Sequence, residues 1–417
     1  MTPHAAADAR LAIFDSRRGW QLGLLGALVT VMLGSIFIIG GIVEVGATDM
    51  ISVSVDFYVF WAAAKLALQG LPLDAFDVTR IAEMAAVTHD DWMPWAYPPG
   101  FLLLVMPLGL LPFAPAWAAF MALSCAALLL ATRPFTAGRT QVLLGTALAP
   151  AILPCLLVGQ TTILWLAGLM AALAALRAEK PVLAGIFIGL LTLKPQLGLL
   201  IPFALIAAGQ WRAILSAALT TLLLAAIPTA LFGTAYWPEM LAMMREHGDT
   251  VRGAIAGLNL MISAYAALTF AGLAESTALA AQWTLTALCA IAVFVTWRRP
   301  STSFDLRAAT LLCAIPLASP YLWHYESALL APAALFLTRA GVVTLQRPLT
   351  VLLGLAMWLS LGPSALVLLK SGAADVFRPV FLPLALAALL TCLWHALFRP
   401  RPAATPAAPA TTPEQPQ

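Results

Sequence analysis

The stretch WQLGLLGALVTVMLGSIFIIGGIV, residues 20–43, decides the class of fold because it contains no charged residue. A helix needs roughly 20 apolar residues to cross the hydrocarbon core of a bilayer, and this run is long enough. Arg17 and Arg18 precede it, but the run is too long for a signal peptide and lacks a convincing small-residue cleavage site. We therefore expect it to be the first membrane helix.

The composition extends this expectation to the whole chain. Hydrophobic residues make up 62% of the 417 positions and charged residues 10%, and the mean hydropathy is +0.92. A soluble domain carries about 25% charged residues. Long apolar runs recur as far as Trp394, so the sequence predicts an all-α polytopic membrane bundle with about 11 transmembrane helices. The net charge of +3 gives no indication of nucleic acid binding.

The chain divides into a short N-terminal segment, a membrane domain and a tail. We expect residues 1–19 to be cytoplasmic, residues 20–399 to form the membrane domain, and residues 47–97 to be its first external loop. Residues 400–417 consist almost entirely of Pro, Ala, Thr and Gln after Arg399 and Arg401, and cannot bury enough apolar surface to fold. This tail is predicted to be disordered and cytoplasmic.

The distribution of Lys and Arg predicts the orientation, because loops on the cytoplasmic side carry an excess of them. The clusters assigned to the cytoplasm are Arg17/Arg18, Arg133/Arg139, Arg177/Lys180, Arg212, Arg298/Arg299/Arg307, Arg339/Arg347 and Arg399/Arg401. The segments expected outside are 47–97, 159–160, 194–196, 233–258, 319–326 and 370–378. Nearly all unusual polar residues then face the extracytoplasmic side of the cell inner (plasma) membrane.

Two segments do not fit this scheme simply. Residues 98–131 resemble two short helices broken around Pro112 and Pro115, and two crossings would place Arg133 outside instead of inside. The run from Asn259 to Ala271 is short for a crossing, so it is either re-entrant or interfacial.

The first external loop is acidic. Its carboxylates are Asp49, Asp56, Asp74, Asp77, Glu83, Asp90 and Asp91, against two cations, Lys65 and Arg80. Apolar residues recur at helical spacing in residues 57–68 and again in residues 78–85, which predicts two amphipathic helices on the membrane surface. Gly70-Leu71-Pro72 separates the two helices.

An ordered set of short motifs carries a resemblance. The motifs are SVDFY (54–58), QGLP (69–72), YPP (97–99) opening a helix, GQ (159–160), LKPQ (193–196) and SPYLWHY (319–325). In this order and membrane placement they resemble the GT-C class mannosyltransferases that depend on polyprenyl-phosphate-mannose, glycosyltransferase family 87. The resemblance runs from about Trp20 to the C-terminal helices.

The resemblance implies a GT-C fold, with two juxtamembrane helices in the first external loop. It also implies transfer of a hexose, mannose in that family, from a polyprenyl-phosphate donor to a lipid or glycan hydroxyl, with inversion. Asp56 occupies the family's catalytic carboxylate position. Such an enzyme would have membrane lipids, the lipid-linked sugar donor and a lipid or glycan acceptor as partners.

Chemistry gives Asp56 the same role independently. A carboxylate close to the acceptor hydroxyl can take its proton while the bond from C1 to the phosphate breaks. The alternative is that Asp56 only caps the surface helix that we expect to begin at Phe57, which Asp does well. Both roles can coexist.

The leaving phosphate calls for a cationic or hydrogen-donating partner, and His324 and Lys194 are the candidates. His324 lies in a polar aromatic segment between two apolar runs, although a lone His is also compatible with a structural role. Lys194 precedes a proline at a helix end and could equally extend to the interface without a chemical role. Glu326 either pairs with His324 or anchors the interface.

Other candidates are weaker. Tyr58, Tyr97 and Gln160 could bind sugar hydroxyls, although interfacial Tyr is usually part of the aromatic belt. Arg245, Arg252 and Arg378 are further outward cations. Of the 13 Trp residues only Trp61, Trp92, Trp95 and Trp323 are expected near the site.

Several motifs are absent from the sequence. There is no P-loop, no GxGxxG after a strand, no HExxH and no DxD pair suited to a nucleotide-sugar metal site, and the five cysteines form no CxxC pair. We therefore expect neither a cofactor nor a metal. The rival interpretations are a transporter or flippase for a lipid-linked glycan, and an oligosaccharide ligase that uses the loop 233–258 with its Arg245, His247 and Arg252.

Overall fold

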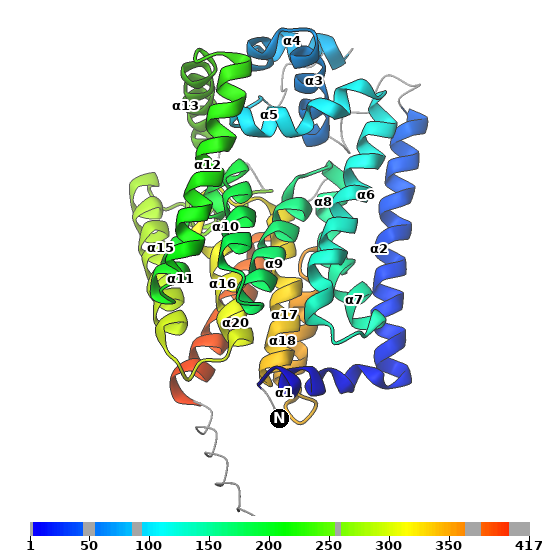
Figure 1. The fold of residues 1–417 in the computed structure, drawn as a ribbon, viewed down its shortest axis with the longest axis vertical. Coiled ribbons are helices and arrows are strands. Elements are labelled where there is room, and N and C mark those ends of the chain that lie inside the picture. Colours follow the sequence, from blue (N-terminus) through cyan, green and yellow to red (C-terminus); the bar gives the residue numbers. More distant parts are fainter. Residues whose placement is uncertain (1–2, 45–54, 86–93, 255–259, 363–376, 400–417) are drawn as a thin grey trace, which may run out of the picture.

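The protein is a bundle of helices with a smaller layer of helices across one end (Figure 1). The computed structural model describes residues 3–44, 55–85, 94–254, 260–362 and 377–399. The tail 400–417 lies outside them, as do Ser54, Asp49, Asp90, Asp91, Trp92 and most of the predicted loop 370–378. Within the described residues the structure contains helices and one isolated β-bridge between Met261 and Trp323.

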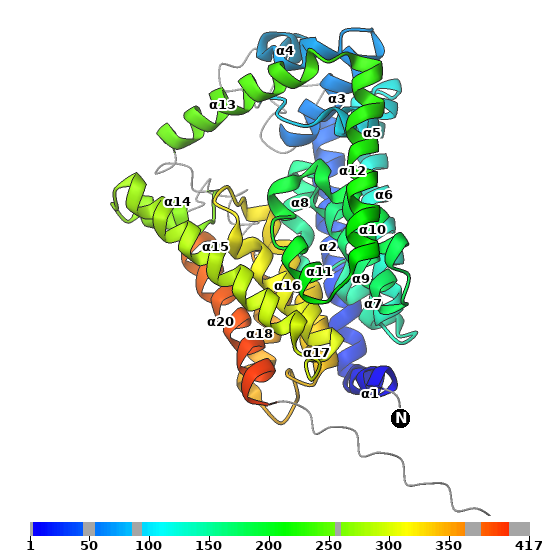
Figure 2. The ribbon, with the colours of Figure 1, turned by 60° about the vertical axis from the view of Figure 1, so that its left-hand side comes forward.

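The elongated bundle and the layers at its two ends are built from separate sets of helices. The bundle consists of α2 (Arg17–Glu44), α6 (Phe113–Thr132), α7 (Thr140–Ala147), α8 (Leu153–Val158), α9 (Thr162–Arg177), α10 (Pro181–Leu190), α11 (Ile201–Ala207), α12 (Trp211–Phe232), α15 (Glu275–Arg298), α16 (Phe304–Ala318), α17 (Leu330–Ala340), α18 (Pro348–Leu359) and α20 (Phe377–Phe398). One end carries α1 (Pro3–Ala9), and we call it the α1 end. The opposite end carries α3 (Val55–Leu68), α4 (Val78–Ala85), α5 (Pro99–Val105), α13 (Tyr236–Ala254) and, lower, α14 (Ala264–Phe270) (Figures 1 and 2).

Five described helices are long and apolar enough to cross a membrane. They are Phe113–Phe135, Thr140–Val158, Trp211–Phe232, Glu275–Arg298 and Pro379–Phe398. Four further apolar helices of the described part are shorter, between 10 and 17 residues. The structure is therefore that of a helical membrane protein, but its described residues do not give the predicted count of about 11 spans.

The segment 98–131 crosses the bundle once, which removes the conflict over Arg133. α5 and the 3₁₀ helix Met106–Leu110 lie across the α3 end, packed on α3 (Figure 1). A Cβ atom on Gly109 would lie 2.9 Å from the backbone of Ala64, so this close packing requires glycine. Only α6 then runs along the bundle, and Arg133 follows its last turn at the α1 end.

Ion pairs at the α1 end join residues from three of the predicted basic clusters. Arg139 pairs with Asp15 at 2.8 Å, and Arg177 lies 3.8 Å from Asp8. Arg339, fully buried at 0% exposure, pairs with both Asp8 and Asp305 at 2.7 Å. The basic residues assigned to one membrane face thus gather at one end of the molecule.

The two helices predicted in the first external loop are present as α3 and α4, but α3 does not lie on a surface. Val59, Phe60, Trp61 and Ala62 follow one another around α3, about 100° apart, and all four are buried. A helix that is apolar on all sides is buried on all sides. The expectation of an amphipathic surface helix therefore fails for α3.

The run Asn259–Ala271 contains α14, whose seven residues are too short to cross a bilayer. Just before α14, Ile262 donates a backbone hydrogen bond to Leu322, and His324 donates one to Leu260. These two hydrogen bonds therefore hold the run against residues 319–326, which follow α15 and α16 in the sequence.

Candidate active site

Asp56 lies in the first turn of α3, one residue after the helix begins at Val55. Its carboxylate accepts a hydrogen bond from Gln160, whose Nε2 lies 2.8 Å from Oδ2 of Asp56. Because α3 starts earlier than predicted, Asp56 is inside the helix and not at the N-cap. A carboxylate in the first turn still interacts favourably with the helix N-terminus, and this structural role can coexist with catalysis.

Gly159 places Gln160 against Asp56. α8 ends at Val158, and Gly159 has a φ of 66°, the left-handed conformation that commonly terminates a helix. The next backbone N–H, that of Gln160, donates to the carbonyl of Cys155 at 2.9 Å. A Cβ atom on Gly159 would also lie 2.4 Å from Cβ of Phe57, so glycine is required both for the turn and for the approach of α3.

The orientation of the Gln160 amide follows from its neighbour. Oε1 accepts hydrogen bonds from the backbone N–H of Thr161 at 2.7 Å and from its hydroxyl at 2.8 Å. A backbone N–H can only donate, so the atom that faces it must be the amide oxygen. Nε2 therefore faces Asp56 as a donor.

A buried ion pair lies beside this arrangement. Nζ of Lys194 is 2.8 Å from Oε1 of Glu326, and the two side chains are 5% and 0% exposed. Lys194 also donates to the hydroxyl of Thr162 at 3.2 Å and lies over the ring of Tyr325 at 4.8 Å. The other oxygen of Glu326 accepts the backbone N–H of Trp323 at 2.8 Å. Glu326 was expected either to pair with His324 or to anchor the interface, and the ion pair that the structure gives it is with Lys194.

Asp56, Lys194 and Glu326 form one electrostatic cluster with two tyrosines. Burial among protein atoms raises the pKa of Asp56 to about 6, although part of the residue's surface stays accessible. The hydrogen bond from Gln160 and the charge of Lys194 oppose this rise, and Glu326 adds to it. The pKa values of Tyr97 and Tyr325 are raised, first by burial and then by the charge of Asp56.

Comparison with known proteins assigns a family to this arrangement. The model of glycosyltransferase family 87 matches residues 95–320, more than half of the chain. The chain belongs to glycosyltransferase family 87. No curated protein and no solved structure matches it. Together with its apolar helices, the family makes this protein a membrane glycosyltransferase.

The family 87 match covers one part of the cluster and omits another. Tyr97, Gln160 and Lys194 lie inside residues 95–320, whereas Asp56 precedes this range and Glu326 follows it. The fold brings the two sets together through the hydrogen bond from Gln160 to Asp56 and the ion pair from Lys194 to Glu326. Any role for Asp56 must therefore be argued from its geometry and chemistry, because the family 87 match does not include this residue.

His324 of this family 87 chain is buried, with 2% exposure, and its ring lies 5.2 Å from that of Tyr325. Burial lowers the pKa of His324 to about 4. The imidazole is therefore neutral at neutral pH and can act as a hydrogen-bond donor or acceptor, but not as a cation.

Other predicted residues lie elsewhere. Tyr58 packs against Trp61 and Phe113 in an aromatic cluster, and Trp95 donates a hydrogen bond to Tyr236. Arg252 pairs with Asp249, also on α13, and lies 3.8 Å from Glu275. Arg245 is exposed on the same helix, which occupies most of the loop that the ligase interpretation needed, and the side chain of Arg378 is outside the described part.

Sequence reasoning missed three residues of the cluster. Thr161 and Thr162 follow the GQ motif directly, and a pair of hydroxyls after a glycine turn was the available signal. Tyr325 belongs to the SPYLWHY motif but was not assigned a role, although its ring faces the ammonium of Lys194.

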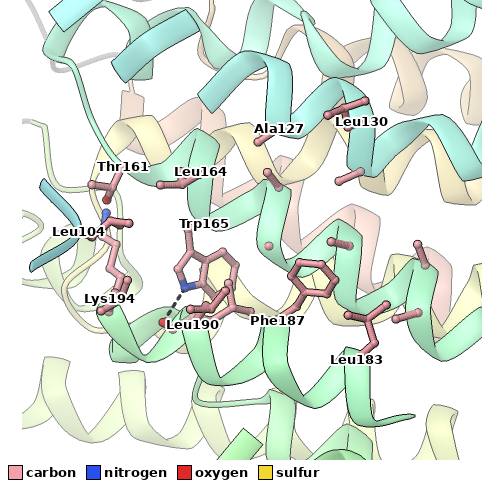
Figure 3. A pocket seen from close by; sticks show the side chains of 18 of the residues that line it. Leu104, Ala127, Leu130, Thr161, Leu164, Trp165, Leu183, Phe187, Leu190 and Lys194 are labelled. Carbon is pink, nitrogen blue, oxygen red and sulfur yellow. Dashed lines mark hydrogen bonds between the residues drawn. The ribbon is translucent and has the colours of Figure 1, made fainter. Parts of the chain in front are cut away.

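A cavity of about 640 Å³ begins at this cluster, between α6, α9 and α10. Thr161 and Lys194 lie at one end of it, and Leu183 lies toward the other, past Trp165 and Phe187 (Figure 3). The indole of Trp165 donates to the carbonyl of Leu191 at 3.1 Å, which fixes the ring at the wall.

Proposed function

We propose that this glycosyltransferase moves a hexose from a polyprenyl-phosphate donor to a hydroxyl of a lipid or glycan acceptor, with Asp56 as the general base. The observation that carries the proposal is the Asp56 carboxylate, held by Gln160 and lying in the field of Lys194. Mannose is the sugar of the family that the ordered motifs resemble. The orientation of the basic clusters supports an active site on the extracytoplasmic side of the plasma membrane.

The reaction is a single displacement with inversion. The acceptor hydroxyl gives its proton to Asp56 while its oxygen attacks C1 of the sugar, and the bond from C1 to the phosphate oxygen breaks. The electron pair of that bond leaves with the polyprenyl phosphate. Because the pKa of Asp56 is about 6, most of the carboxyl is in the basic form at neutral pH while remaining a stronger base than an exposed aspartate.

Lys194 is the group suited to the leaving phosphate. An ammonium has three N–H groups, and Lys194 donates one of them to the hydroxyl of Thr162 while it forms an ion pair with Glu326. A cation in a water-poor site stabilises charge that develops on a leaving group more strongly than it would in water. His324 can contribute only a neutral hydrogen bond.

The test compares two isosteric variants in purified protein supplied with polyprenyl-phosphate-mannose and membrane lipid extract. Asp56→Asn keeps the shape of the side chain but cannot accept the proton, so transfer should fall by at least about a hundredfold while the unfolding temperature stays near that of the parent. Asp77→Asn is the control, because Asp77 caps α4 in the same loop and Asn caps equally well.

Substantial transfer by a well-folded Asp56→Asn protein would defeat the mechanism. Movement of a lipid-linked sugar across proteoliposomes without turnover would instead indicate a flippase. Equal turnover with polyprenyl-phosphate-glucose would leave the mechanism in place and refute the preference for mannose.

A further inference from the structure

A second, smaller cavity lies at the α1 end of the molecule, where α16 begins and α20 ends. Residues 301–303, which we call the α15–α16 turn, line it together with His395 and Arg399 of α20. Its volume of about 60 Å³ gives room for about five non-hydrogen atoms, since one water needs about 10–15 Å³. The turn and the end of α20 lie at the opposite end of the bundle from α3 (Figure 1). The cavity is therefore separate from the Asp56 cluster.

Thr302 of the turn presents a buried hydroxyl to this cavity. The residue is 5% exposed, and its Oγ1 has no hydrogen-bond partner among the described residues. Its backbone N–H, by contrast, donates to the carbonyl of Arg299 at 3.1 Å, which fixes Thr302 in the turn. Buried polar atoms normally have a partner, so a hydroxyl of this kind on the wall of a cavity indicates a polar ligand.

The ring of His395 presents a second such atom. Nδ1 donates to the carbonyl of Thr391 at 2.9 Å, because a carbonyl oxygen can only accept. Nε2 is buried and has no partner in the described part of the chain. The cationic ring donates through Nε2 to an anion, and the neutral ring accepts there from a hydroxyl. A phosphate group with hydroxyls beside it therefore suits either form.

The start of α16 adds a partial positive charge. The helix begins at Phe304 with Ser303 as its N-cap, and Oγ of Ser303 accepts the N–H of Leu306 at 3.3 Å. The N–H groups at a helix N-terminus attract negative charge. Since Ser303 also lines the cavity, this end of α16 favours an anion there.

The full charges at this corner of the protein are mostly positive. Arg298 and Arg299 end α15 directly before the turn, and Arg399 follows the last residue of α20. Asp305, the carboxylate in the first turn of α16, is already paired with the buried Arg339 at 2.7 Å. The cavity therefore lies in a positive field, which selects an anion over a neutral or cationic ligand.

An apolar stripe of α20 runs beside the cavity. Leu390, Trp394 and Phe398 recur every four residues, and they are 62%, 53% and 65% exposed. His395 and Arg399 each follow a member of this stripe by one position, so the polar and the apolar stripes are neighbours on one helix. In a membrane protein such an apolar stripe contacts lipid, and Trp is common at the interface. An anion held here is thus within reach of a lipid that lies along α20.

We propose that this cavity binds the phosphate of an anionic phospholipid, with Thr302, His395 and Arg399 as its ligands and the acyl chains along Leu390 and Trp394. The α1 end is the end that the basic clusters assign to the cytoplasmic side, and basic pockets between membrane helices on that side suit anionic head groups. A lipid bound in this way joins the α15–α16 turn to α20. The inference goes beyond the proposed function, because it requires no sugar transfer.

The test measures lipid binding to the purified full-length protein by native mass spectrometry. Titration should show one site that binds phosphatidylglycerol at least about tenfold more tightly than phosphatidylcholine. Thr302→Val removes the hydroxyl with little change of shape and should weaken this site about tenfold, the scale of one hydrogen bond to a charged group. Arg399→Gln should weaken it by at least as much. Thr302→Ser keeps the hydroxyl and should bind phosphatidylglycerol as the parent does.

Two matched controls report effects that do not come from the cavity. Thr284→Val removes an exposed hydroxyl of α15, and Arg212→Gln removes an exposed cation of α12. Both residues are outside the lining. We expect both variants to bind phosphatidylglycerol with the affinity of the parent.

Two results would overturn the site. One is equal affinity for phosphatidylglycerol and phosphatidylcholine, and the other is unchanged affinity for phosphatidylglycerol in both Thr302→Val and Arg399→Gln. Glycerol 1-phosphate separates the two sources of a phosphate group. If it binds as tightly as phosphatidylglycerol, with the same losses in the variants, the ligand is a soluble phosphate and the phospholipid is refuted.

Discussion

Nε2 of Gln160 donates a hydrogen bond to Oδ2 of Asp56 over 2.8 Å, between residues 104 positions apart in the chain. The other end of the same amide is occupied by Thr161. The sequence offered Gln160 as a ligand for sugar hydroxyls, and in the structure its amide oxygen accepts from Thr161 while its Nε2 donates to Asp56. We propose that Gln160 also positions the carboxylate of Asp56.

Gln160→Leu should shift the pH dependence of transfer. The amide donates to the charged form of Asp56 and so lowers its pKa, which burial has raised to about 6. Without the donor that pKa rises, so the acidic limb of kcat/KM should move to higher pH by about one unit. Gln141→Leu is the control, because Gln141 donates to Asp15 at the α1 end. An unmoved limb would remove Gln160 from this role.

His324 should act as a neutral donor. Since burial lowers the pKa of His324 to about 4, no change in transfer between pH 6 and 8 should depend on this residue. We expect His324→Ala to lower kcat about a hundredfold, the scale of one lost donor at a developing charge. His324→Gln, which keeps an N–H, should recover part of this loss. Full activity in His324→Ala would return His324 to a structural role.

The contribution of the Lys194–Glu326 ion pair to folding stability should be separable from the contribution of Lys194 to binding polyprenyl phosphate. Lys194→Met leaves Glu326 buried without its cation, which costs about 3–5 kcal/mol of folding stability. Adding Glu326→Gln should restore most of the unfolding temperature but not the affinity for polyprenyl phosphate. A double variant that binds the lipid normally would show that Lys194 does not contact the phosphate.

Impermeant thiol reagents should label the two ends of the molecule from opposite sides of the membrane. Single cysteines at Glu83 and Lys180, both exposed, report the α3 end and the α1 end. The background needs only Cys125→Ala, because the other four native cysteines are buried. We expect Glu83→Cys to react from outside intact cells and Lys180→Cys only after lysis. Labelling of both from one side would refute the proposed orientation.

The sequence predicted the site residues that stand out from their immediate neighbours in the chain. Asp56, the Gly159-Gln160 turn and Lys194 could be selected because polar residues in an apolar chain are expensive and therefore stand out. The partner of Lys194 could not, because the pairing with Glu326 depends on how η9 (His324–Leu329) packs against α9. Tertiary packing alone decides such contacts.

The fold likewise has features that the sequence predicted and features that only tertiary packing decides. The helices α3 and α4 were predicted from their spacing, but the burial of α3 on all sides was not, since an Ala-rich apolar helix reads similarly in an interface and in a core. The single crossing of residues 98–131 also depended on tertiary structure, because Gly109 allows the preceding turn to lie on α3.

The pairing of Arg339 with Asp8 has a practical consequence for anyone preparing this enzyme. Removing the first 15 residues, or fusing a tag that displaces α1, would take away one of the two carboxylates that compensate a guanidinium with 0% exposure. A buried charge deprived of a partner costs several kcal/mol. The N-terminal segment therefore stabilises the α1 end by pairing Asp8 with Arg339. Affinity tags should be placed on the C-terminus.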